Sequence, residues 1–307
     1  QRQMVIRDRA YYNVKKLPQR AYEEMEKAFA LDETDARVYL ELDQLKKRLN
    51  VAVKERWSDM EKHFDLVESR DDLYLEYVTL LNTLGEPEKA LGLIKARKFH
   101  QWEGGEGKVA AQYLTALYQL AKAAVEKEDY AEAKELLLRA VGEYPHNLGE
   151  GKLESGQENN LYYLLGLVQE KLGEAKDAFE SLTRACCGES EPVGMMYYND
   201  QPPEMIYYQG LAYRMLGEEE QAVRRFQKLV DYGREHIRDD VKIDYFAVSL
   251  PDLLIFEENL NERNRKHCLF MMSLGLKGLG RIDEAEKCAE ELLAMDNAHQ
   301  EIRVHDL

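Results

Sequence analysis

One short pattern occurs four times in the chain and constrains its fold more than any other feature. A Leu-Gly dipeptide is followed, five residues after the glycine, by an alanine; the glycines are Gly85, Gly173, Gly217 and Gly280, and the alanines are Ala90, Ala178, Ala222 and Ala285. Each dipeptide lies between stretches with the apolar spacing of helices, and glycine ends a helix at little cost because it adopts a left-handed conformation. The pattern predicts helix pairs joined by short turns. Because no pair buries its own apolar face, the pairs must stack into an all-α solenoid.

The residues around these turns resemble the tetratricopeptide repeat. In residues 159–188 the match is carried by Tyr162, Leu165, Gly166, Gly173, Ala178, Leu182 and Ala185. The small residues allow two helices to approach closely, and the large apolar residues fill the gap to the next pair. The resemblance implies that the whole chain, 1–307, forms one right-handed superhelix of about seven repeats. We expect the repeats at about 2–33, 35–68, 71–99, 110–146, 159–188, 203–235 and 266–297, with a helical insertion at about 236–264.

The repeats are longer than the 34 residues of a standard tetratricopeptide repeat. Equivalent first-helix positions lie 43, 45, 44 and 63 residues apart, at Tyr74, Leu117, Tyr162, Ile206 and Leu269. About ten extra residues therefore occur at three junctions and about thirty at the fourth. Every insertion follows the second helix of a pair, so the insertions should project from one edge of the solenoid. Long structured loops are often functional.

The insertions combine aromatic rings with polar side chains, a combination that suits the binding of sugars or peptides. The candidate binding residues are Trp102, Glu103, Glu106, Lys108, Asn147, Glu150, Lys152, Tyr197, Tyr198, Asn199, Asp200, Asp244, Tyr245 and Phe246. The alternative is that the aromatic rings only bury one insertion against the next.

The sequence Gly-Glu-Gly-Lys occurs twice, at 105–108 and 149–152. A phosphate-binding loop requires G-x-x-x-x-G-K-[ST] after a strand. Trp102 and His146 stand in place of the first glycine, and Val109 and Leu153 in place of the Ser/Thr. A nucleotide site is therefore not expected. Either the glycine ends a turn while Glu and Lys cap and charge the next helix, or these residues form the polar wall of a binding site.

Composition excludes several classes of function. The formal net charge is −16, and the absence of a basic stripe argues against nucleic acid as a partner. No run of about 18 apolar residues is available to span a membrane. The seven histidines are dispersed without a catalytic motif, and the four cysteines lack the spacing of a zinc site. We expect a cytoplasmic protein that is not an enzyme, with no catalytic residue, no cofactor and no bound metal.

Three segments resemble the C-terminal repeat region of a family of large bacterial proteins whose N-terminal domain is β-rich and of unknown function. They are residues 102–108, 197–205 and 242–251. The resemblance implies a bacterial fragment without that domain and assigns no functional residue. We therefore expect a non-catalytic scaffold that binds a protein or peptide, either its own N-terminal domain or a partner segment, through the concave face or the insertion edge. The alternative is a module that binds a carbohydrate or small ligand, in which the insertions complete the site of a carbohydrate-linked N-terminal domain.

Overall fold

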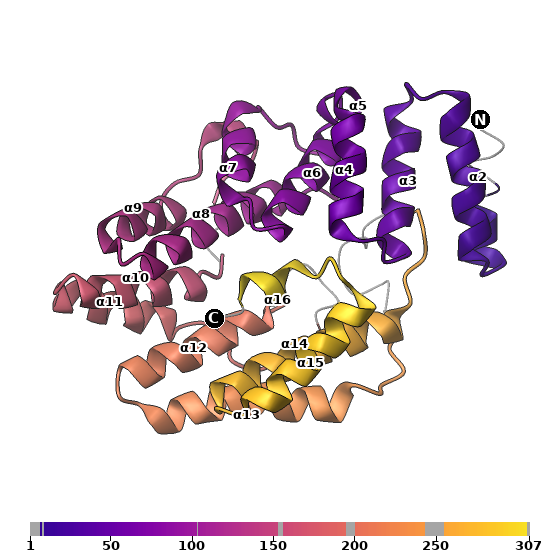
Figure 1. Ribbon diagram of the computed structural model, residues 1–307. Helices are drawn as coiled ribbons and strands as arrows, with labels where there is room; N and C mark the ends of the chain where they lie inside the picture. The colour runs from indigo at the N-terminus through magenta and orange to yellow at the C-terminus, as the bar shows by residue number, and fades with distance from the viewer. Residues whose placement is uncertain are drawn as a thin grey trace.

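The regular elements of this protein are helices throughout the part of the chain that the computed structural model describes, namely residues 7, 9–102, 104–152, 156–194, 200–242 and 255–305. The helices form pairs that stack side by side and curve into a superhelix (Figure 1). The predicted all-α, tetratricopeptide-like solenoid is confirmed.

The first repeat consists of the short segment η1 (Ala10–Val14) and α2 (Pro18–Leu31), and the second of α3 (Ala36–Arg48) and α4 (Val53–Lys62), followed by α5 (Phe64–Glu68). The next five pairs are α6 (Asp71–Thr83) with α7 (Pro87–Ala96), α8 (Lys108–Glu126) with α9 (Tyr130–Val141), α10 (Asn159–Lys171) with α11 (Ala175–Ala185), α12 (Pro203–Met215) with α13 (Glu219–His236), and α14 (Leu260–Gly278) with α15 (Ile282–Met295). The short helices η2 (His146–Leu148) and α16 (Gln300–Val304) lie outside these pairs.

The turn inside four of these pairs has the conformation that the Leu-Gly pattern predicts. Gly85, Gly173, Gly217 and Gly280 have φ angles of 77°, 78°, 82° and 74°. The residue after each glycine donates its N–H to the carbonyl five residues earlier, as Glu174 does to Gln169 at 2.9 Å. The α8–α9 turn has the same geometry without glycine, because Glu128 adopts a φ of 58° and Asp129 donates to the Ala124 carbonyl at 2.9 Å.

Small residues in the first helices allow close packing of each pair. A Cβ atom on Gly166 would lie 2.7 Å from Cγ of Leu182, and one on Gly210 would lie 2.4 Å from the ring of Phe226. Because real Cβ contacts are longer than this, a larger residue at either position would push the two helices apart.

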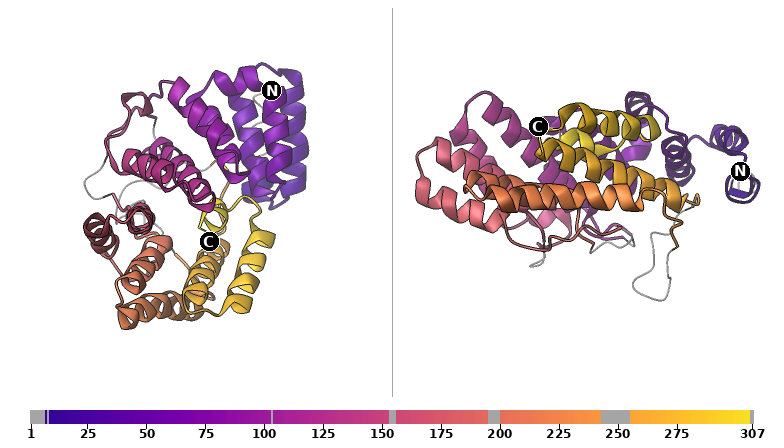
Figure 2. Two further views of the ribbon diagram at one scale, coloured as in Figure 1. Left: turned by 60° about the vertical axis from the view of Figure 1, so that its left-hand side comes forward. Right: turned by 90° about the horizontal axis from the view of Figure 1, so that it is seen from below.

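The superhelix bends until the residues just before its last repeat meet its first two repeats. The Nδ2 of Asn13 donates to the Ile255 carbonyl at 3.0 Å, and Arg48 forms an ion pair with Glu258 at 3.0 Å. The rings of Tyr12 and Phe256 pack edge to face at 5.2 Å. The helix pairs therefore curve around the C-terminal end of the described chain (Figure 2).

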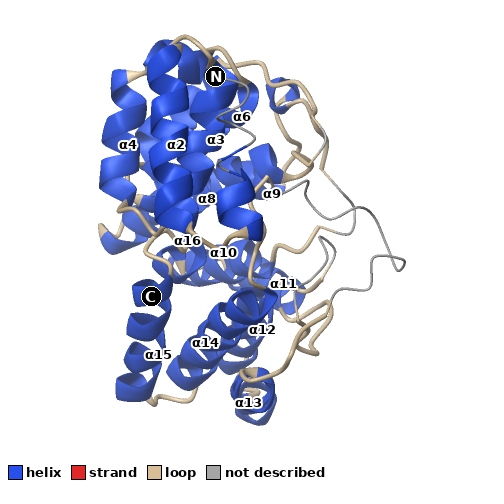
Figure 3. Cartoon of the chain, turned by 90° about the vertical axis from the view of Figure 1, so that its right-hand side faces the viewer, coloured by secondary structure: helices blue, strands red, loops and turns tan. Residues whose placement is uncertain are grey.

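The loops between successive pairs gather on one side of the molecule, as predicted (Figure 3). The fourth insertion departs from expectation in the parts that the structure describes, because residues 237–242 and 255–259 are not helical. α14 begins at Leu260 because the side chain of Asn259 accepts hydrogen bonds from the N–H groups of Asn261 and Glu262. Residues 243–254 lie outside the described residues.

Candidate functional site

The candidate Trp102 lies in the first insertion, where its ring packs on the backbone. A Cβ atom on Gly105 would lie 2.3 Å from a ring carbon of Trp102. The cavity beside this ring, bounded by Leu148 and Glu150 among others, has a volume of about 10 Å³, which is hardly more than one water molecule needs. Trp102 therefore seals the contact between the first two insertions, and this cavity has no room for a sugar ring.

The candidate Asn147 connects the second insertion to the end of α7. Its Nδ2 donates to the carbonyls of Ile94 at 2.8 Å and Arg97 at 2.9 Å, and its own carbonyl accepts the N–H of Phe99 at 2.8 Å. The last carbonyls of a helix have no partner within the helix. Asn147 satisfies two of the carbonyls at this end of α7 and fixes the insertion against it.

The two Gly-Glu-Gly-Lys copies are not equivalent in the structure. Gly107 of the first copy, with a φ of 74°, immediately precedes α8. Glu150 of the second copy caps that same helix, because its carboxylate accepts the N–H groups of Gly107 at 2.7 Å and Ala110 at 2.8 Å. Lys152 forms an ion pair with Glu158 at 2.8 Å. One copy thus begins the helix and the other supplies its cap.

Of the remaining candidates that the structure describes, Glu106 lines the same small cavity as Trp102 and Glu150, whereas Lys108 and Asp200 do not line it. Glu106 and Lys108 are exposed at the start of α8, and Asp200 is half-buried before α12. Seven candidates lie outside the described residues: Glu103, Tyr197, Tyr198, Asn199, Asp244, Tyr245 and Phe246.

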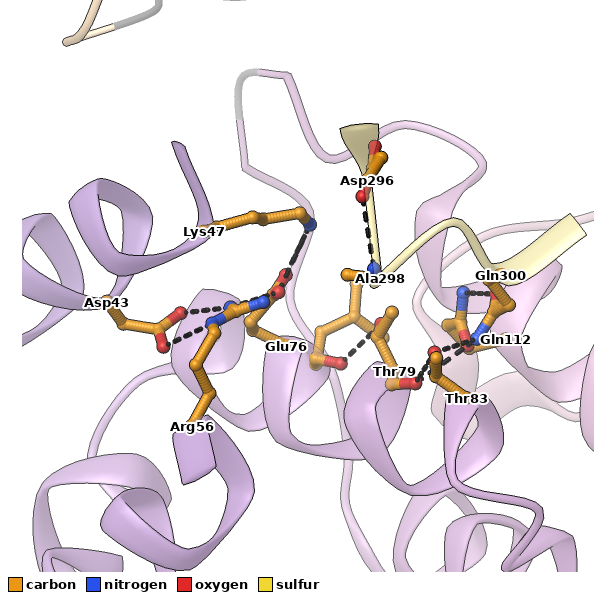
Figure 4. Close-up of polar contacts among 11 residues, drawn as sticks. Asp43, Lys47, Arg56, Glu76, Thr79, Thr83, Gln112, Asp296, Ala298 and Gln300 are labelled. Carbon is orange, nitrogen blue, oxygen red and sulfur yellow. Dashed lines mark hydrogen bonds and ion pairs between the residues drawn. The ribbon is translucent and has the colours of Figure 1, made fainter. Parts of the chain in front are cut away.

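A different surface lies at the centre of the superhelix, where α6, α8 and α12 face residues 296–305. We call these residues the C-terminal segment and the facing side chains the inner surface. The Nε2 of Gln300 donates to the Thr79 carbonyl and to Oγ1 of Thr83, both at 3.1 Å, while Nε2 of Gln112 donates to Oε1 of Gln300 at 2.9 Å (Figure 4). The amide of Gln300 is thus recognised through both its donor and its acceptor.

The backbone and the apolar side chains of the C-terminal segment are also bound. Nζ of Lys122 on α8 donates to the Val304 carbonyl at 2.9 Å. Ile302 and Val304 are only 8% and 6% exposed and join the hydrophobic core, whereas Glu301 and Arg303, the residues that precede each of them, are exposed. From Gln300 to Val304, every second residue is therefore buried against the surface.

His305 ends the segment among buried tyrosines. Its Nδ1 lies 3.1 Å from the Tyr208 hydroxyl, which lies 2.6 Å from the hydroxyl of Tyr118. Burial, together with the positive charge of Lys122, lowers the pKa of His305 to about 3. His305 is therefore neutral near pH 7, and its ring takes part in the hydrogen-bonded chain without a charge.

A buried carboxyl group at the start of α12 also interacts with the C-terminal segment. Glu204 is 8% exposed. Burial raises its pKa to about 8, and the negative charge of Glu301 on α16 adds to the increase. Near pH 7 most Glu204 carboxyl groups are protonated, and ionisation at higher pH would place two like charges near one another.

The loop before α16 is joined to the α3–α4 turn by one asparagine. The Asn297 N–H donates to Oδ1 of Asn50 at 2.8 Å, its Nδ2 donates to the Asn50 carbonyl at 2.8 Å, and its Oδ1 accepts the Val53 N–H at 3.0 Å. Asn50 has a φ of 56°, a conformation that asparagine tolerates better than most residues. We call this contact the asparagine latch.

A buried ion network fixes the helices beside the latch. Arg56 on α4 is fully buried and binds Asp43 on α3 through Nε at 3.0 Å and Nη2 at 2.6 Å, and Glu76 on α6 at 2.7 Å (Figure 4). Burial opposes the charge of Glu76, but Lys47 and Arg56 outweigh it and lower the pKa of Glu76 to about 2. Because an unpaired buried charge is costly, this network holds α3, α4 and α6 in fixed relative positions.

An open groove of about 580 Å³ lies elsewhere, along α2, α3 and α4. It is lined by polar side chains, including Tyr22, Glu26, Lys54 and Lys62, and by the ion pair of Lys46 with Asp59 at 2.6 Å. The lining includes none of the residues predicted as binding candidates.

The family model of the tetratricopeptide repeat matches residues 115–147 and 204–232, which contain α9 and most of α8, α12 and α13. The chain contains tetratricopeptide repeats. Such repeats generally mediate binding between proteins. No helix among the described residues is long and apolar enough to cross a membrane.

Several solved structures are similar to the chain. MamA is 18% identical, over 71% of this chain and 92% of its own, with a TM-score of 0.25. YrrB, a TPR protein with an unusual peptide-binding site, is 18% identical over 80% of this chain and 97% of its own, with a TM-score of 0.27. BtubC from P. vanneervenii is 13% identical over 96% of this chain and 91% of its own, with a TM-score of 0.31.

Sequence reasoning missed the C-terminal segment, because the last predicted repeat ended at about residue 297. One signal was present: Ile302 and Val304 continue an apolar pattern beyond the last repeat. Two apolar residues at alternate positions are too few to indicate a helix or a strand, and nothing in the sequence connects them to α6 or α8.

Proposed function

We propose that this protein is a non-catalytic interaction module whose inner surface binds a peptide segment of a partner protein. One observation carries the proposal: the inner surface already holds a stretch of peptide, residues 296–305, through contacts to side chains and backbone. Gln112 binds the amide of Gln300, and Lys122 binds the carbonyl of Val304. Contacts to a carbonyl accept many sequences, whereas a pocket for an amide selects among them.

The concave face is therefore favoured over the insertion edge as the docking surface. In the first two insertions, the candidates Trp102, Asn147 and Glu150 are engaged in joining the insertions and capping helices. A wide exposed apolar patch typical of an interface is not evident on these loops in the described residues. A domain that precedes the repeats in a longer chain is one source of the partner segment.

A carbohydrate site at the insertions receives less support. A drug-sized or sugar-sized ligand needs a pocket of roughly 300 Å³ or more, and the cavity beside Trp102 has about 10 Å³. The candidates at 197–199 and 244–246 lie outside the described residues, so the carbohydrate hypothesis remains a prediction about those loops.

A peptide display selection on the intact chain tests the proposal. We expect enrichment of peptides with an amide side chain followed by aliphatic residues, and weaker binding of these peptides to Lys122→Met. This variant keeps the apolar stem and removes the ammonium group that binds the Val304 carbonyl. Phe179→Ala serves as the control, because its ring is 62% exposed on α11. If no peptide is enriched, or if Lys122→Met binds the enriched peptides as well as the natural chain does, the inner surface is not the docking site.

A further inference from the structure

We propose that the C-terminal segment is an intramolecular ligand, which occupies the inner surface and must leave before a partner peptide can bind. This inference rests on the proposed function and states how peptide binding at the inner surface is regulated. It also describes the partner: a peptide that reproduces the contacts of residues 300–305.

The first argument is that the segment has the properties of a bound peptide. Its helix, α16, has five residues, far fewer than the roughly 12 that a helix needs to be stable alone in water. The contacts that keep it folded come from distant helices: Thr79 and Thr83 on α6, and Gln112 and Lys122 on α8. Without these helices the segment would have no means to stay helical.

The second argument is the chemistry of the face that the segment presents. Gln300, Ile302 and Val304 are buried, and His305 is 7% exposed, whereas Glu301 and Arg303 are exposed. A partner peptide would need an amide side chain at the position of Gln300 and aliphatic residues two and four positions later. Five positions after the amide it would need a neutral ring, where His305 meets Tyr208. The exposed positions place no such demand on the partner.

The third argument is that the segment is held by contacts that can be exchanged. The asparagine latch consists of hydrogen bonds at 2.8–3.0 Å, of which the two between Asn297 and Asn50 are exposed, and exposed bonds contribute little when water can replace them. Glu301 also lies near the buried Glu204. Because the segment is attached by a short tether, its effective concentration at the inner surface is of the order of millimolar. A weaker latch lowers the affinity of the segment for the surface and should therefore increase the binding of an added peptide.

The test measures binding of a fluorescent peptide with the sequence of residues 296–305, Asp-Asn-Ala-His-Gln-Glu-Ile-Arg-Val-His, by anisotropy. We expect weak binding to the natural chain and about tenfold tighter binding to Asn297→Ala, which removes the latch bonds of the Asn297 side chain. The matched control is Glu290→Ala on the exposed face of α15, which should bind like the natural chain. A scrambled peptide should bind to neither.

Two further variants keep the test decisive. Asn50→Gly removes the latch bond that the Asn50 side chain accepts from the Asn297 N–H and keeps the positive φ of residue 50, so it weakens the latch from its other side if Asn297→Ala fails to fold. A peptide that carries Gln300→Ala should bind either latch variant only weakly, because the added peptide then loses its contacts to Thr79, Thr83 and Gln112 while the segment of the chain keeps them.

Hydrogen exchange at the amides of 300–305 shows whether the segment leaves. Faster exchange when an unlabelled partner peptide binds supports displacement. Peptide binding with unchanged protection overturns the inference, as does equal affinity of the natural chain and both latch variants.

If peptides from the display selection bind equally well to all forms, the proposed function stands and the intramolecular ligand does not. If no form binds any peptide, both fail. A concentration-dependent dimer of the latch variant with full protection would assign the surface to a second copy and also overturn the inference.

Discussion

At the scale of single residues, some positions adopt a state that is unfavourable by itself and is held in place by the surrounding structure. Glu204 keeps a carboxyl group in a buried site, and Glu128 adopts a positive φ at a turn where four other pairs use glycine. The sequence could not reveal the burial of Glu204, because nothing near Glu204 in the chain shows that the site is buried or that the charge of Glu301 acts on it. It could reveal the second, because the α8–α9 pair lacks the Leu-Gly dipeptide.

Glu204→Gln should change how stability depends on pH. The folded pKa of Glu204, about 8, is above its ordinary value of 4.5. The contribution of this group to the free energy of unfolding is therefore fully present below pH 4.5 and is lost as pH rises through 8. The glutamine side chain would stay neutral at every pH, so the variant should be more stable than the natural chain at pH 8 by about 2 kcal/mol or more, and similar to it at pH 4.5.

Urea unfolding at several pH values measures this difference. Glu143→Gln, at an exposed position, should leave the pH dependence unchanged. A natural chain and a Glu204→Gln variant with parallel stability curves would show that Glu204 is ionised at neutral pH in the folded state.

Glu128→Gly should stabilise the protein. The left-handed conformation costs a residue with a side chain about 1–2 kcal/mol, and glycine avoids this cost but loses more entropy on folding. We expect a net gain of about 0.5–1 kcal/mol in the free energy of unfolding. Gly173→Ala makes the reverse change at the equivalent turn, where φ is 78°, and should destabilise. Equal stability of Glu128→Gly and the natural chain would mean that this turn carries no strain.

At the scale of elements, the sequence predicted what depends on local pattern and missed what depends on distant contacts. The turn glycines and small residues identified the helix pairs because their effects act within one pair. The residues Asn147 and Glu150 were predicted as binding candidates, and the structure places them as caps of α7 and α8. Sequence cannot separate these roles, since an exposed ligand contact and a cap use the same polar side chains.

Glu150→Ala tests the capping role. Its carboxylate accepts the N–H groups of Gly107 and Ala110, and loss of such a cap costs about 1 kcal/mol. Hydrogen exchange should become faster at the first turn of α8. The control is Glu106→Ala, an exposed glutamate in the loop just before α8, which should change the free energy of unfolding by less than about 0.5 kcal/mol. If both variants unfold at the same urea concentration, the cap contributes nothing to stability.

At the scale of the whole molecule, the superhelix is closed, and closure changes how its parts depend on one another. In an open solenoid each repeat contacts only its neighbours, so a change at one end stays local. Here Phe256, just before the last repeat, packs on Tyr12 of the first, and Asn297 binds Asn50 of the second. The repeat pattern predicts the curvature of the chain but contains no information on these side chains, which lie more than 240 residues apart.

Phe256→Ala should therefore loosen the first repeat from a distance. The Phe256 side chain is 2% exposed, and truncating a buried phenylalanine costs about 3–5 kcal/mol where the site cannot collapse. Because Tyr12 and the segment at 255–258 would lose their contact, amide exchange should accelerate in η1, α2 and α3, while α10 and α11 on the far side keep their protection. Phe179→Ala, at a position 62% exposed, should affect neither region. In a closed superhelix, Phe256→Ala speeds amide exchange at both ends of the chain. In an open solenoid, faster exchange would be confined to the residues beside position 256, and that result would rule out closure in solution.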